Sequence, residues 1–189
     1  MSRVLFAVTT SNALYSKILR WAMKSNINHS LVLYQSKEWG DWWAVEINER
    51  GVNKIPVDKL TRVGYMECYE CSEDIWPALR ATKDFVGERY DWLGLLGGLF
   101  KLIAYRLFGR KSKEPVHRDD RLFCSEYVAH VMYHAALPGA GKVDGYGKIP
   151  NTVAWRPETV SPEYLQNFFQ ASPLFERVDA PPGIPFEKM

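Results

Sequence analysis

Length, composition and charge limit the kinds of protein that this chain can be. Its 189 residues, 47% of them hydrophobic, can form one sizeable core, so we expect a single domain over residues 1–189. A net charge of +2, from 24 basic and 22 acidic residues, creates no field that favours nucleic acid as a partner. Three cysteines without framework spacing fit a reducing compartment and free thiols.

The N-terminal part of the chain predicts a strand followed by a helix. The apolar run at residues 3–8 favours a strand and is too short for the core of a signal peptide, so we expect a cytoplasmic protein, or a virion-associated one if a phage encodes it. Polar residues 9–12 have helix-capping chemistry for a helix over about residues 13–24. That helix is expected to bury a stripe formed by Leu14, Ile18, Trp21 and Ala22.

Two neighbouring strands are expected next. Residues 29–34 are rich in strand formers and begin at His29, and residues 42–48 alternate so that Glu46 and Asn48 share one face. Because the loop between these strands is short, they should pair antiparallel. His29 and Glu46 can then lie side by side on one face of the sheet.

The remaining segments predict further α and β elements around one unusual stretch. We expect a strand over residues 62–71, a helix over about residues 74–89 and a short helix over residues 161–169. The segment from Trp92 to Phe108 is apolar but interrupted by glycines and two basic residues. It predicts a core helix or a flap over a cleft, with membrane or virion contact as the alternative. Residues 180–189 form a proline-rich tail that should not continue regular structure.

A cysteine stands where a helical pattern begins. After Cys124 the apolar positions recur at helical spacing as far as Ala135, and a Leu-Pro-Gly sequence ends the pattern. The unpaired N–H groups and the positive dipole end at a helix start favour a thiolate, the nucleophilic form of the side chain. The alternative is a buried structural cysteine, because free cysteine is among the most buried residue types.

A cysteine hydrolase needs a thiolate, an imidazole that accepts and returns a proton, and a polar group that orients the imidazole. Cys124, His29 and Glu46 supply these types, and Asn48 is an alternative third group because it lies on the same expected strand face. In the competing interpretation, His29 is a strand histidine with satisfied hydrogen bonds and Glu46 is a solvated carboxylate.

The other candidate ligand pairs do not favour a metal or a cofactor. Cys68 and Cys71 have the spacing of a metal or redox pair, but residues three apart on a strand point to opposite faces. His130 and His134 can share a helix face, but no third ligand is evident. No glycine-rich phosphate loop follows a strand in the required form. We therefore expect neither a metal nor another cofactor.

Several short motifs follow one another in an order that resembles a known family. They are the helix at Leu14 to Met23, Asn28-His29-Ser30-Leu31-Val32-Leu33-Tyr34, Ala44-Val45-Glu46-Ile47 with Gly51-Val52, Gly87-Glu88-Arg89-Tyr90-Asp91, and Phe123-Cys124-Ser125-Glu126-Tyr127-Val128. This order resembles that of the circularly permuted papain-fold amidases. These are the bacterial and phage branch of the superfamily that includes NlpC-type peptidoglycan endopeptidases and, more distantly, lecithin:retinol acyltransferases. In the permuted enzymes the histidine strand precedes the cysteine helix, as it does here.

The resemblance implies a fold, a reaction and a set of site residues. The fold would be α+β and papain-like, with a small antiparallel sheet packed against helices. Cys124 would be the nucleophile, His29 the general base and acid, and Glu46 the orienting group in a hydrolase that cleaves an amide bond through a thioester. The residues expected to bind substrate or shape the cleft are Tyr90, Asp91 and Ser125.

The implied partner is a peptide or acyl substrate, with peptidoglycan stem peptides first. The alternatives are a lipid acyltransferase or thioesterase of the same fold, and a non-catalytic virion structural module. One departure from the family is Asn28, where serine is common, which bears on local packing more than on chemistry.

Overall fold

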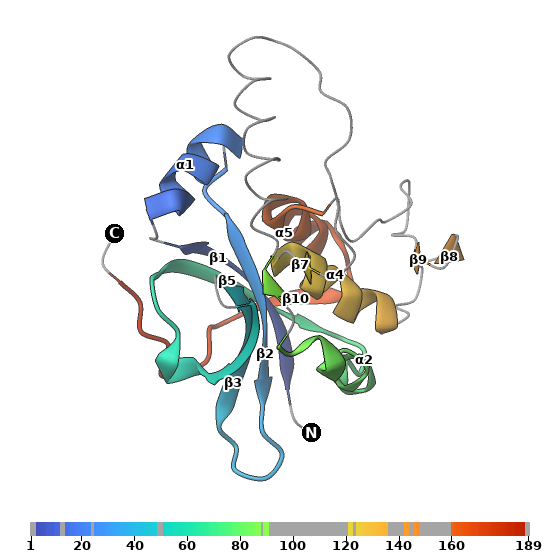
Figure 1. Cartoon of the computed structure of the whole chain (residues 1–189). Coiled ribbons are helices and arrows are strands. Elements are labelled where there is room, and N and C mark those ends of the chain that lie inside the picture. The colour runs from blue at the N-terminus through green and yellow to red at the C-terminus, as the bar shows by residue number, and fades with distance from the viewer. Residues whose placement is uncertain are drawn as a thin grey trace.

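The structure is a computed structural model of the chain (Figure 1). It describes residues 3–11, 14–23, 25–48, 51–87, 89–90, 121–122, 124–135, 142–143, 146–147 and 160–187. These residues form an α+β fold in which helices accompany a six-stranded antiparallel sheet, as expected for the fold class. The expected flap between Trp92 and Phe108 lies outside the described residues.

The sheet has the strand order β10-β5-β1-β2-β3-β4, and each neighbouring pair is antiparallel. The central strands β1 and β2 consist largely of buried apolar residues, which fits strands covered on both faces. The strand bounds are β1 Val4–Ser11, β2 His29–Gln35, β3 Trp42–Asn48, β4 Gly51–Pro56, β5 Val63–Cys71 and β10 Phe175–Val178.

The helices and short strand pairs surround this sheet. In Figure 1, α2, α4 and α5 gather on one side of the sheet, and the C-terminal stretch runs along the other. The helices are α1 Leu14–Met23, α2 Trp76–Ala81, α4 Cys124–His134 and α5 Pro162–Ala171, with 3₁₀ turns η1 Val57–Lys59 and η2 Lys83–Phe85. Two short ladders pair β6 Arg89–Tyr90 with β7 Arg121–Leu122 in parallel, and β8 Lys142–Val143 with β9 Tyr146–Gly147 antiparallel.

Alternation along the strands produces a core on each face of the sheet. On the helix side, Val32 and Val45 pack in one buried cluster with Val128 of α4. On the other side, Leu31 and Leu33 pack in a second cluster, which the side chains of η1 and of the C-terminal stretch complete. The sheet is therefore held between two apolar layers, and the start of α4 is fixed against the strands of its helix side.

The expected buried stripe of α1 is wrong for two of its four residues, and the side chains of the other two, Leu14 and Ala22, lie outside the description. Ile18 is 47% exposed and Trp21 is 50% exposed, whereas Ser16 is fully buried. The helix therefore turns the face that carries Ser16 inward. Residues 9–12 were expected to cap this helix, but β1 continues to Ser11 and so includes residues 9–11.

Other boundaries were also predicted incorrectly. No strand was predicted for residues 51–56, which form the edge strand β4. A terminal proline is tolerated there because, among the described strands, β4 pairs only with β3. The helix expected over residues 74–89 ends at Ala81, where the Thr82 hydroxyl donates to the Leu79 carbonyl at 3.0 Å. The C-terminal tail lacks a long regular element, but Phe186 forms an isolated bridge with Val63.

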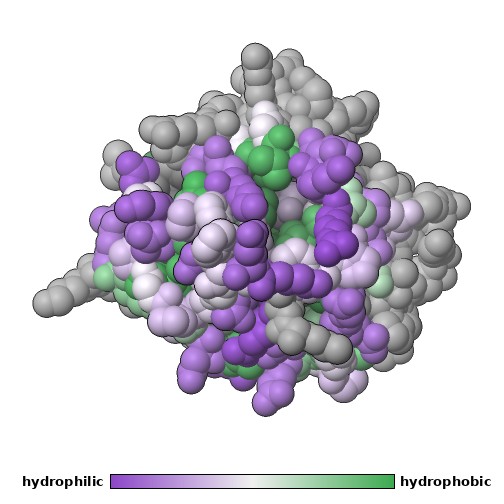
Figure 2. Space-filling view, turned by 90° about the horizontal axis from the view of Figure 1, so that it is seen from below, coloured by the Kyte–Doolittle hydropathy of each residue, from purple (hydrophilic) through white to green (hydrophobic). Residues whose placement is uncertain are grey.

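The membrane contact considered for this chain can be compared with the polarity of one face of the molecule and with the length of its described helices. Seen from below, from the end where the loop between β2 and β3 projects, the surface is largely hydrophilic with small apolar patches (Figure 2). None of the helices in the described ranges is long and apolar enough to cross a membrane.

Candidate active site

Cys124 is the first residue of α4 and is buried, with 9% of its surface exposed. The chain enters this helix from β7, which is fixed by its ladder with β6. Val128 and Val131 then anchor α4 in the core on the helix side of the sheet. The sulfur therefore lies at a helix start, where unpaired backbone N–H groups favour negative charge, as the sequence predicted.

His29 is the first residue of β2 and pairs with Thr9 of β1. Its neighbour Asn28 holds this end of the sheet, since its backbone N–H donates to the Thr9 carbonyl at 3.2 Å and its Oδ1 accepts from the Ser11 N–H at 2.8 Å. The Asn28 side chain therefore ties the start of β2 to the end of β1. The side chain of His29 is 18% exposed.

Glu46 lies beside His29, as the expected strand pairing required. The register of β2 with β3 places Leu31 opposite Glu46, so Glu46 shares a sheet face with His29, two residues before Leu31. His29 Nε2 and Glu46 Oε2 are 3.7 Å apart, and the Glu46 side chain is 12% exposed. The structure thus brings an imidazole and a carboxylate together in a largely buried environment.

Asn48 contacts Glu46 and continues the polar network. Its Nδ2 donates to Glu46 Oε1 at 2.8 Å, so Asn48 supports the carboxylate that faces His29. Asn53 of β4 in turn donates from Nδ2 to Asn48 Oδ1 at 3.0 Å and to the Gly51 carbonyl at 2.7 Å. Asn53 was missed by the sequence interpretation, because its only signal is its place opposite Glu46 on a strand that was not predicted.

Electrostatics in this cluster favour charge separation between Cys124 and His29. Burial by itself lowers the pKa of His29, but the charge and hydrogen bond of Cys124, together with those of Glu46, raise it far above its ordinary value. Burial raises the pKa of the Cys124 thiol, but the charge and hydrogen bond of His29 outweigh burial and lower it. Burial likewise raises the pKa of Glu46, and the interactions with His29 and Asn48 reverse that shift. The site therefore favours a thiolate beside an imidazolium.

Ser30 is a further contributor that the sequence interpretation did not single out. Its backbone N–H and its side chain both help to lower the pKa of Cys124. The hydroxyl oxygen is buried and has no hydrogen-bond partner among the described residues. The hydroxyl is therefore available to donate toward the sulfur. The backbone N–H of Ser30 differs in that its position is fixed by the fold.

The other two cysteines differ from Cys124 in their surroundings. Cys68 belongs to one apolar cluster and Cys71 to the other, so the two side chains lie on opposite faces of β5, as strand geometry predicted. Burial raises the pKa of Cys68 to about 12 and also raises that of Cys71. Within the part of the chain that the structure describes, no group of three or more metal-ligating side chains converges.

The three residues expected to bind substrate or shape the cleft have different positions. Ser125 is buried, and its hydroxyl donates to the backbone carbonyl of Val160, so it joins the start of α4 to the segment that leads into α5. Tyr90 ends β6 and pairs with Leu122, two residues before Cys124. The position of its side chain, and Asp91 as a whole, lie outside the described residues.

Comparison with known proteins does not assign the chain to a family. No protein-family model matches the sequence, and no curated protein is significantly similar to it.

Proposed function

We propose that the protein is a cysteine hydrolase with a permuted papain-like fold that cleaves an amide or related acyl bond. The observation that carries the proposal is the cluster of Cys124, His29 and Glu46 from three separate elements, in which the pKa of the thiol is lowered and the pKa of the imidazole is raised. Perturbed titratable groups that act on one another are typical of active sites. A structural cysteine needs no such partner, and Cys68 shows how burial alone acts on a thiol in this fold.

The first half of the reaction forms a thioester. The Cys124 thiolate attacks the substrate carbonyl carbon, and the electron pair of the carbonyl moves to its oxygen. The backbone N–H of Cys124, at the start of α4, is the natural donor to that oxygen. As the tetrahedral intermediate collapses, the C–N bond breaks and the His29 imidazolium gives its proton to the leaving amine.

The second half releases the acid and regenerates the pair. Neutral His29 takes a proton from water, and the resulting hydroxide attacks the thioester carbonyl. The C–S bond then breaks and returns the thiolate beside the imidazolium. Glu46 holds His29 through Nε2, which leaves Nδ1 as the ring nitrogen for the sulfur, and Asn48 fixes the carboxylate.

The preferred substrate is a peptide of the peptidoglycan stem type, on the basis of the family resemblance. A lipid acyl group is the second candidate, and the exposed apolar side chains of Ile18 and Trp21 on α1 favour it. In both cases the intermediate is a thioester on Cys124, and the acyl group that it carries differs with the donor.

The experiment is a turnover assay with purified muropeptides and, in parallel, vesicles that contain acyl lipids. We expect the wild-type chain to release new amino and carboxyl groups from the muropeptides, or free fatty acid from the acyl lipids. Cys124→Ala and His29→Ala should release neither. Cys68→Ala serves as a matched control because it removes a buried thiol that the proposed mechanism does not use. Turnover that survives in Cys124→Ala would refute the proposed function.

A further inference from the structure

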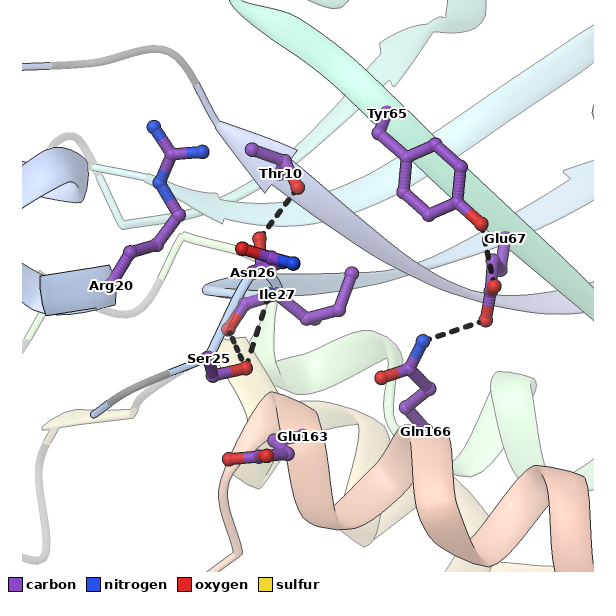
Figure 3. A pocket seen from close by; sticks show the side chains of 9 residues that line it. All are labelled: Thr10, Arg20, Ser25, Asn26, Ile27, Tyr65, Glu67, Glu163 and Gln166. Carbon is purple, nitrogen blue, oxygen red and sulfur yellow. Dashed lines mark hydrogen bonds between the residues drawn. The ribbon is translucent and has the colours of Figure 1, made fainter.

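A polar pocket opens beside the candidate active site (Figure 3). Its volume is about 630 Å³, within the range of small-molecule binding sites. Its walls come from the last turn of α1, the connection into β2, the neighbouring strands β1 and β5, and the first turns of α5. The catalytic mechanism proposed above uses none of the side chains that line it.

Two short links place this pocket next to the catalytic cluster. Ile27 lines the pocket and lies two residues before His29. Glu163, also on the wall, lies three residues after Val160, whose carbonyl accepts the hydrogen bond from Ser125 at the start of α4. The segments that line the pocket therefore continue into the one that carries His29 and the one that holds the start of α4.

One of the charged groups on the wall is already compensated by the protein. The Glu67 carboxylate accepts hydrogen bonds from Tyr65 Oη at 2.6 Å and from Gln166 Nε2 at 2.8 Å. Tyr69 Oη donates to it as well at 2.6 Å, and Arg177 lies 3.3 Å from it. Glu67 is therefore satisfied within the fold and is not the group that a ligand would neutralise.

Two other charges on the wall lack such compensation. The Arg20 guanidinium comes from α1 and the Glu163 carboxylate from the start of α5 (Figure 3), and each residue is half-buried. Among the residues that the structure describes, neither side chain forms a hydrogen bond or an ion pair. A partly desolvated charge favours a partner of opposite sign, so the wall presents one site for an anion and one for a cation.

We propose that this pocket binds the part of a peptide substrate that carries both an anionic and a cationic group, such as a short peptide with free ends. The anionic group lies against Arg20 and the cationic group against Glu163. An uncharged acyl chain would cover both charges without pairing either, so the pocket distinguishes a peptide from a lipid. The link to catalysis rests on the proposed function, whereas the binding itself does not.

The test measures binding of trialanine to the Cys124→Ala protein, which cannot turn it over, by NMR titration. The N-acetylated and the C-amidated forms of trialanine are titrated in the same way. We expect the free peptide to bind at least about tenfold more tightly than either capped form, since each cap removes one charge-assisted contact. Arg20→Ala should weaken binding of the free peptide, and the affinity should then no longer depend on C-amidation. In Glu163→Gln the affinity should no longer depend on N-acetylation.

Matched controls come from charges outside the pocket. Lys17→Ala, on the exposed part of α1, and Glu176→Gln, on β10, should leave all three affinities unchanged. Absence of measurable trialanine binding would overturn the proposal. Equal affinities for free and capped peptides, or unchanged affinities in the Arg20 and Glu163 variants, would overturn it too.

The pocket and the proposed function can fail separately. Alkylation of Cys124 as a function of pH reports the thiolate and does not depend on the pocket. If trialanine does not bind while Cys124 titrates with a lowered pKa, the pocket proposal fails and the function stands. If trialanine binds as expected while Cys124 titrates like a buried thiol, the pocket is a peptide site and the hydrolase proposal fails.

Discussion

Removing the imidazole beside Cys124 should change the pKa of the thiol more than any other single substitution. In His29→Ala the sulfur keeps its burial, which raises the thiol pKa, and loses the charge and hydrogen bond that lower it. An opposite charge within contact distance shifts a pKa by about 1–3 units, and the lost hydrogen bond adds to that change. We therefore expect the midpoint to rise by at least about 2 pH units, equivalent to about 2.7 kcal/mol.

The assay for this prediction is the rate of iodoacetamide alkylation at Cys124 across pH, followed by peptide mapping. A rate at one pH is a poor measure, because a thiolate of higher pKa is also more nucleophilic, with a Brønsted coefficient of about 0.4–0.5. The pH at which the rate is half-maximal avoids this compensation. The wild-type midpoint should lie below that of an ordinary thiol, and the midpoint of His29→Ala should lie above it, because only burial then acts on the sulfur.

Two controls separate a local effect from loss of the fold. Cys68, whose pKa burial raises to about 12, reports the labelling of a thiol without an imidazole partner, and it becomes reactive if the chain unfolds. His29→Gln retains a polar side chain of similar size and should behave as His29→Ala does. The reasoning is refuted if the midpoint for Cys124 is the same in the wild type and in both folded variants.

Three further predictions concern the surroundings of the pair. Glu46→Gln should lower kcat on the preferred substrate by at least about tenfold and should lower the pKa of His29. Asn48→Ala acts through Glu46 and should lower kcat less. Equal kcat values for the wild type and Glu46→Gln would exclude the orienting role of Glu46. Glu67→Gln should reduce the free energy of unfolding by about 1.5–3 kcal/mol at pH 7. Burial raises the pKa of Glu67, but its hydrogen bonds lower it overall. The stabilisation is therefore complete above the ordinary glutamate pKa and disappears as pH falls through the lower pKa of the folded state. Urea titrations that give the same stability difference between wild type and Glu67→Gln at pH 7 and below pH 4 would contradict this. Ser125→Ala should reduce the free energy of unfolding by about 1–3 kcal/mol, because the buried Val160 carbonyl loses its hydrogen-bond donor. Unchanged stability in thermal or urea unfolding would show that this hydrogen bond is dispensable.

Local sequence patterns predicted the positions of Cys124 and His29 in the fold. They did not predict all of the residues that hold His29 in place. Cys124 could be located because a helix start is visible in the spacing of apolar residues, and His29 because a strand begins there. The choice between Glu46 and Asn48 could not be made, since residues two apart on a strand share a face. The register of β2 with β3 and the 3.7 Å separation from His29 place Glu46 against the ring.

Long-range packing accounts for most of the failures in the fold. Asn53 was missed because β4 begins with a glycine and ends with a proline, and its edge pairing with β3 has no local signal. The stripe of α1 was misassigned because helical periodicity identifies a face but not the surface that meets it, and here Ser16 rather than Ile18 faces inward. The pocket residues come from several elements that are separate in sequence, so no motif could have revealed them.

The ion pair between Cys124 and His29 is tested most directly by ¹⁵N NMR of the His29 ring. If the sulfur is a thiolate at neutral pH, both ring nitrogens should be protonated at pH 7.5, and the ring should lose a proton only near its raised pKa of about 10. In Cys124→Ala the pKa of His29 should fall by several units, because burial then opposes the charged form with only Glu46 to support it. A ring that is neutral at pH 7.5 in the wild type, with the same pKa in Cys124→Ala, would contradict the account.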